Sequence, residues 1–148
     1  ANWFNEEVAA DWMEDRQKMM TILQEEAELN EIVQMVGMDA LSPTDRLKME
    51  AARSIREDFL HQNSFHEIDT YTPIRKQYLM MKLVLAFYEK SVDALNKGAD
   101  MNALIAMPVR EKIGRYKYTT DADIESEYKN VEEELDKEVA AAFGKEDF

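Results

Sequence analysis

Residues that break helices are scarce and widely spaced in this chain of 148 residues. They are Gly37, Gly98, Gly114 and Gly144, with Pro43, Pro73 and Pro108. Such a composition is typical of long helices joined by short loops. No segment shows the alternation of apolar and polar residues expected of a half-buried strand. We therefore predict an all-α fold, a bundle of about five to six helices that includes a long helical hairpin.

The predicted hairpin occupies the first part of the chain. Apolar residues recur at spacings of three, four and seven along the segment 11–36, up to Val36, which predicts one helix that ends at Gly37. Ser42 is a good N-cap and Pro43 suits the first position of a second helix. The apolar stripe of that helix is Leu47, Ala51, Ile55 and Phe59. The two helices should pack as a hairpin whose tip is acidic.

The remaining helices are predicted over residues 72–96, 100–107, 108–116 and 123–143. The first of these is apolar on nearly all sides, so we expect it to be the buried centre of the bundle. The last is rich in glutamate and carries only a thin apolar stripe, so we expect it to be solvated and to fray. We accordingly separate a helical bundle domain over residues 1–118 from an acidic C-terminal helix and tail over residues 119–148.

Acidic residues dominate the charge of the chain. There are 31 Asp and Glu against 18 Lys and Arg, a formal net charge of −13. The phosphate backbone of a nucleic acid would be repelled by most of this surface, so we exclude nucleic acid as a partner. Uninterrupted apolar stretches are only a few residues long, so we expect no direct membrane insertion. The absence of cysteine excludes disulfides and thiolate metal sites.

The polar stretch from Arg56 to Tyr71, REDFLHQNSFHEIDTY, interrupts the helical pattern and carries one large ring, Phe65. An apolar ring in a polar loop between two helices can plug the edge of the core or stack on a ligand. The residues alone favour packing of Phe65 at the edge of the core, and they leave stacking on a ligand as an open alternative.

The sequence contains no recognisable catalytic centre. It has no phosphate-binding glycine loop, no G-x-G-x-x-G and no H-E-x-x-H motif. A di-iron bundle needs paired Glu-x-x-His motifs, whereas the only histidines, His61 and His66, lie in one segment. We predict no metal site, and we interpret the glutamates at 25, 26 and 28 as a solvated helix face. The methionines could line a binding groove, but Met80 and Met81 lie in the expected core, which favours gap-filling.

A family resemblance emerges from three runs. They are QEEAELNEIVQMVGMDALSPTDRLKMEAARSIREDFLHQNSFHEIDTY, KQYLMMKLVLAFY and PVREKIGRYKY. Together they resemble the C-terminal helical domain of the catalytic A subunit, or alpha chain, of V-type and A-type rotary ATPases, in a form closer to archaeal or bacterial proteins than to vacuolar ones. The resemblance covers Trp3 to about Tyr118, and it is most specific at REDFLHQNSF and IDTY.

The resemblance implies that this chain is one domain of a longer catalytic subunit. ATP hydrolysis or synthesis, coupled to H⁺ or Na⁺ transport, would then belong to the full-length subunit with ATP or ADP and Mg²⁺, and no cofactor is expected on this domain alone. The implied partners are the B subunits of the hexameric ring, the central stalk (rotor) and the upstream nucleotide-binding domain. The implied location is cytoplasmic, peripheral on the inner face of the membrane. The alternative is an independent acidic helical protein-interaction domain without a nucleotide role.

The resemblance also implies roles for individual residues. Phe65 corresponds to the family residue that packs against the adenine ring, and Tyr71 corresponds to a second aromatic in the pocket of the related ATP synthase β subunit. The implied rotor-facing turn is Asp39, Ala40, Leu41, Ser42, Pro43, Thr44 and Asp45. Only Asp39 and Asp45 are charged in this turn, so the resemblance favours a steric push by a stiff hairpin over a push driven by charge.

Overall fold

The computed structural model describes residues 6–60 and 74–144, and every regular element in these ranges is helical. The major helices are α1 (Glu6–Val36), α2 (Pro43–Ser54), α4 (Ile74–Asn96), α5 (Met101–Ile105), α6 (Val109–Arg115) and α7 (Ile124–Ala141). A π-helix, η2 (Ile55–Leu60), continues α2, and single 3₁₀ turns are η1 (Met38–Ala40), η4 (Tyr116–Tyr118) and η5 (Asp121–Asp123). The predicted all-α class is confirmed.

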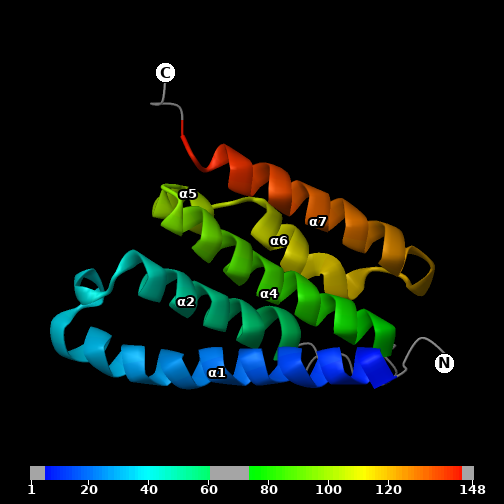
Figure 1. Cartoon of the computed structure of the whole chain (residues 1–148), viewed down its shortest axis with the longest axis horizontal. Helices are drawn as coiled ribbons and strands as arrows, with labels where there is room; N and C mark the ends of the chain where they lie inside the picture. Colours follow the sequence, from blue (N-terminus) through cyan, green and yellow to red (C-terminus); the bar gives the residue numbers. More distant parts are fainter. Residues whose placement is uncertain (1–5, 61–73, 145–148) are drawn as a thin grey trace.

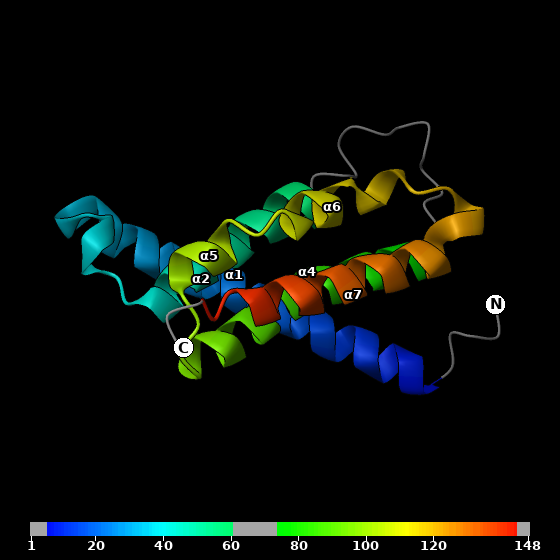
Figure 2. The same ribbon diagram turned by 90° about the horizontal axis from the view of Figure 1, so that it is seen from above.

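Helix α4 lies in the middle of the bundle. Figure 1 shows the antiparallel α1–α2 hairpin on one side of it and α7 on the other. Figure 2, seen from above, shows α5 and α6 extending along the bundle beside α2. Helix α4 contacts α1, α2, α6 and α7, which explains why its sequence is apolar nearly all round.

The core is built largely from side chains of α4. Its buried residues are Lys76, Leu79, Met80, Met81, Leu83, Val84, Leu85, Phe87, Ser91 and Ala94. Full burial of one large apolar side chain contributes about 1.5–3 kcal/mol, so this helix anchors the fold. The predicted buried centre is therefore confirmed, and so is the place of Met80 and Met81 in the core.

The helix boundaries follow the local signals. The Oγ of Ser42 accepts a hydrogen bond of 3.1 Å from the N–H of Asp45, and Pro43 opens α2. Gly37 ends α1 with φ of 94°, a conformation that favours glycine. The predicted start near residue 11 is too late, because α1 begins at Glu6.

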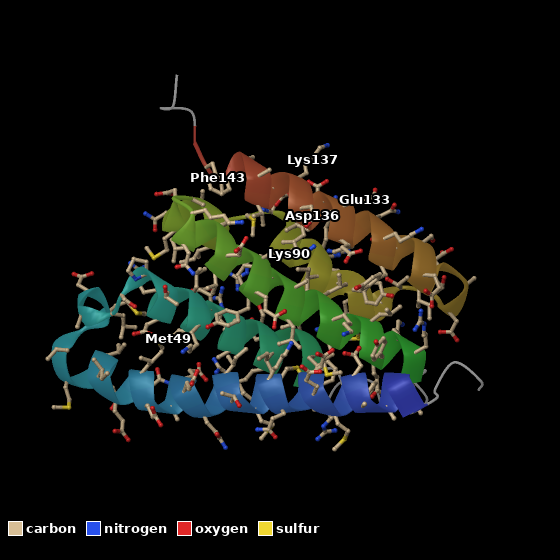
Figure 3. The ribbon with its side chains drawn as sticks, in the orientation of Figure 1. Met49, Lys90, Glu133, Asp136, Lys137 and Phe143 are labelled. Carbon is tan, nitrogen blue, oxygen red and sulfur yellow. The ribbon has the colours of Figure 1, made fainter. Side chains whose placement is uncertain are left out.

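The expectation that the last helix is solvated is wrong for the face that meets α4, whereas its fraying stays a prediction. Helix α7 packs along α4 and buries Ile124, Val131 and Leu135. Lys90 of α4 and Asp136 of α7 form an ion pair of 2.6 Å across the seam, and Figure 3 labels both. The thin apolar stripe of α7 is sufficient for this packing because α4 presents many apolar side chains to it. The division into residues 1–118 and 119–148 stays a prediction.

The solvated glutamate face is also wrong at one position. Glu26 is 8% exposed and pairs with Arg56, from the far end of the hairpin's second helix. Residue 26 follows Ile22 by four and precedes Leu29 by three, so it shares their inward face. Its neighbour Glu25 pairs with Lys48 of α2 at 2.8 Å. Both ion pairs fasten α1 to the second helix.

Arg110 of α6 joins three other helices. Its guanidinium donates hydrogen bonds to the Oε1 and backbone oxygen of Glu50 (2.8 and 3.2 Å) and to the Oγ of Ser54 (3.0 Å), both in α2. It also donates to the backbone oxygen of Ile105 in α5 (3.0 Å). The same group lies 4.5 Å from the ring centroid of Phe87 in α4. A planar fork of donors is needed to satisfy so many acceptors at once.

We expect Arg110→Ala to lower the free energy of unfolding by about 3 kcal/mol, because it removes the hydrogen bonds to Ser54 and to the backbone of Glu50 and leaves the Glu50 carboxylate to Arg53 alone. Arg110→Lys should recover only part of the loss, since an ammonium cannot reproduce the fork. The exposed Arg115→Ala of the same helix is the matched control. Urea denaturation followed by circular dichroism measures all three. A loss under about 1 kcal/mol for Arg110→Ala would contradict the clamp.

Candidate functional site

The predicted adenine contacts, Phe65 and Tyr71, lie outside the described residues, as do His61 and His66. Their flanks are described. The π-helix η2 ends at Leu60, immediately before this segment, and α4 begins at Ile74, immediately after it. The described residues therefore fix both anchors of the predicted nucleotide-contacting segment.

The seven residues predicted to face the rotor lie at the left end of Figure 1, where residues 39–42 connect α1 to α2 and residues 43–45 form the first turn of α2. Asp39 and Ala40 are exposed, whereas Leu41 is buried and its N–H donates to the backbone oxygen of Met38 at 3.1 Å. Leu41 thus holds the turn against the bundle. The role of the turn stays a prediction.

An exposed apolar cluster adjoins this turn, which we call the tip cluster: Ile32, Met35, Val36 and Met38. The side chains of Met35 and Val36 are 83% and 65% exposed. Sequence reasoning placed Val36 in the inward stripe, which is wrong because α1 has extended past the bundle and no helix faces this position. The end of α1 contains more apolar residues than its inward-facing positions can hold, and this surplus was the signal in the sequence that could have revealed the cluster.

A polar cleft of about 470 Å³ lies at the other end of α2. Residues of α2 and η2 line one wall, and residues of α5, α6 and η4 line the other. Asp58 of η2 sits there against Gly114 of α6, where an added Cβ would come within 2.8 Å of the carboxylate. A larger residue at position 114 would require the carboxylate of Asp58 to shift.

Burial raises the pKa of Asp58 to about 6, and the nearby charges of Lys117 and Arg110 oppose this shift. Lys117 also donates a hydrogen bond of 3.2 Å to the backbone oxygen of Glu57, so η4 is tied to η2. The cleft therefore joins the base of the predicted nucleotide-contacting segment to α6.

The described residues contain neither a metal-binding group nor a membrane-spanning helix. Among residues 6–60 and 74–144, no group of three or more acidic or histidine side chains is arranged to hold a metal ion. Within the same ranges, no helix combines the length and the apolar character needed to cross a membrane.

The comparison with known families decides the relationship. A family model described as the C-terminal domain of V and A type ATP synthase matches residues 1–105. The chain belongs to this family. The V-type ATP synthase alpha chain of Acetivibrio thermocellus is 54% identical over 144 residues, which is 97% of this chain and 24% of that protein. The alpha chain of Clostridioides difficile is 51% identical over 138 residues, 93% of this chain and 23% of that protein.

The resemblance inferred from the sequence is thus confirmed. A third V-type ATP synthase alpha chain, from Thermoanaerobacter pseudethanolicus, is 50% identical over 141 residues, 95% of this chain and 23% of that protein. The chain spans about a quarter of the length of these relatives. Similarity over 144 of 148 residues extends beyond the family model into α7, in agreement with the packing of α7 on α4.

The raised pKa of Asp58 predicts a pH-dependent stability. In the folded chain the pKa of its carboxyl lies above the ordinary value of 3.8, so the carboxyl holds its proton more tightly than in the unfolded chain. Asp58 therefore costs nothing at about pH 4 and below, and it lowers the free energy of unfolding as the pH rises to about 6. Because the carboxyl is partly solvated, we expect Asp58→Asn to stabilise the chain at neutral pH by only about 1 kcal/mol.

Thermal unfolding of wild type and Asp58→Asn at several pH values measures this difference. The gain from the substitution should vanish at about pH 4. Glu133→Gln, on the exposed face of α7 (Figure 3), makes the same change in charge and should show no such trend. A gain that stays constant with pH would refute the role of the Asp58 charge.

Proposed function

We propose that this chain acts as the C-terminal domain of the alpha chain of an ion-translocating V/A-type ATP synthase. In this role it contributes to the adenine side of the nucleotide pocket and transmits conformational change to the central rotor stalk. The observation that carries the proposal is the identity of about half, across nearly the whole chain, with relatives named V-type ATP synthase alpha chain. Catalysis with ATP and Mg²⁺, and coupling to H⁺ or Na⁺, are assigned to the full-length subunit on the cytoplasmic side of the membrane.

The nucleotide contact is assigned to Phe65 and Tyr71. Support comes from the position of their segment, which follows η2 directly. The π-helix is held on several sides, because it contacts α2, α4 and α6. A base stacked on Phe65 would therefore be linked to the packed end of the second helix.

The rotor contact is assigned to the turn from Asp39 to Asp45 together with the tip cluster. Four exposed apolar side chains adjoin a turn that carries only two carboxylates. Exposed apolar patches on a soluble domain commonly mark a protein contact. The contact we propose is therefore steric and apolar, with little contribution from charge.

The hairpin is built to move as one body. Residues Pro43–Leu60 form 12 residues of α-helix and 6 of π-helix in continuous order, a span of roughly 27 Å. Ala51 and Ala52 are fully buried, and the pairs Glu26–Arg56 and Glu25–Lys48 fasten this helix to α1. Because packed helices shift as rigid units, a small closure near residue 60 can displace the tip. The remaining partners in this proposal are the B subunits of the ring and the upstream domain.

We expect Phe65→Ala in the full-length subunit to weaken ATP binding by about tenfold, since base stacking on an aromatic ring contributes about 1–3 kcal/mol. The turnover rate at saturating ATP should change little, because the phosphates are bound by the upstream domain in this proposal. ATP titration of the assembled complex measures the affinity, with Tyr118→Ala, an exposed aromatic, as control. Unchanged affinity would remove Phe65 from the pocket and favour a domain without a nucleotide role.

We expect Met35→Asp to reduce the number of ions moved per ATP hydrolysed, because a carboxylate in an apolar contact costs about 2 kcal/mol. The control is Met13→Asp, which changes another exposed methionine, near the other end of α1. ATP-driven ion uptake into vesicles, recorded beside ATP hydrolysis, separates coupling from chemistry. Equal coupling in both variants would exclude the tip cluster from the rotor contact.

A further inference from the structure

A groove follows the seam between α1 and α4, and none of its lining residues belongs to the tip cluster or to the segment 61–73. It consists of two adjoining hollows of about 490 Å³ and 320 Å³. The larger is lined by α1 and α4, and the smaller also reaches Tyr128 and Glu132 of α7. The two hollows share Glu14, Lys18, Leu85 and Glu89. The ion pair of Lys18 with Glu89 belongs to the lining of both hollows. We call the two adjoining hollows together the α1–α4 groove.

The floor of the α1–α4 groove is apolar. Ile22 and Leu85 form its base and are themselves part of the core, and Tyr88 lies half-buried at its side. Burial raises the pKa of the Tyr88 hydroxyl, which marks a poorly hydrated wall. A large apolar side chain entering here would displace water from an apolar surface, which stabilises a complex.

The rim of the groove is acidic. Its acids are Asp11, Glu14, Asp15, Glu25, Glu89 and Glu132, and its bases are Lys18, Lys82 and Lys90. All three lysines are already engaged by acids, Lys18 by Glu89 at 3.2 Å, Lys82 by Asp11 and Asp15, and Lys90 by Asp136.

Two rim acids remain to face a partner. Among the described residues, Glu14 and Glu132 form no ion pair with any base. An apolar floor beneath uncompensated carboxylates attracts a segment with an apolar side chain at its centre and positively charged side chains on either side.

We propose that the α1–α4 groove is a docking surface for a basic amphipathic helix of another protein chain. Its apolar side chains enter the hollow over Ile22 and Leu85, and its lysines or arginines lie along the carboxylate rim. Such a helix buries its apolar face while the rim supplies charge complementarity. A second copy of this chain is the wrong occupant, because its net charge of −13 opposes that of the rim.

The test uses the 148-residue chain and a fluorescent amphipathic helical peptide of about 18 residues, built from leucine on one face and lysine and alanine on the other. Fluorescence anisotropy at about 150 mM salt, where long-range attraction is screened, measures its affinity. A peptide of the same composition with its leucines dispersed around the helix should bind at least about tenfold more weakly. Equal binding of the two peptides would overturn the proposal.

Two matched substitutions on α1 separate the groove from general attraction. Glu14→Lys places a positive charge on the rim and should weaken binding of the amphipathic peptide by about tenfold. Glu28→Lys makes the same change in net charge at an exposed position outside the groove and should alter affinity by less than about twofold. Equal weakening would show non-specific attraction and refute the site. Dimers in sedimentation equilibrium that Glu14→Lys abolishes would assign the groove to a second copy and likewise refute the proposal.

Discussion

Helix α4 is enclosed along most of its length, and the arrangement of every other helix follows from that burial. It contacts the hairpin helices on one side and α6 and α7 on the others, so each neighbour needs to offer only one apolar stripe. That is why the thin stripe of α7, with Val131 and Leu135, is buried in spite of the glutamates around it. The guanidinium of Arg110 reaches into this packing, where it lies on the ring of Phe87 and donates hydrogen bonds to α2 and α5.

The second helix of the hairpin is bound differently from α7. Its inward positions include Ala51 and Ala52, and such small side chains let the backbone approach α4 closely. Lys48 of this helix and Arg56 of its π-helical continuation pair with Glu25 and Glu26 of α1. Tight packing on one side and ion pairs on the other prevent the helix from sliding alone, so a displacement at either end is shared by the whole hairpin.

Signals that act within a few residues made much of this fold predictable from sequence. The Ser42 cap and Gly37 set a helix start and a helix end through their own backbone chemistry, and the all-round apolar character of α4 predicted its burial. Burial that depends on a neighbour was not predictable in the same way. Glu26 looked solvated because its partner Arg56 is 30 residues away in sequence. The tip cluster was missed because the point at which α1 extends beyond the other helices depends on tertiary packing, which the sequence pattern of α1 does not show.

The tip cluster and the α1–α4 groove are both apolar, but their charge and shape suit different contacts. Met35 is 83% exposed and the adjoining turn has only two carboxylates, so in the proposed rotor contact a partner would meet few charges there. Methionine side chains adapt to a changing surface because they are unbranched and flexible. The groove beside Glu14 is concave and rimmed by acids, which fixes the register of a partner through charge. A moving contact at the tip and a stationary one at the groove would let the hairpin transmit force without releasing its neighbour.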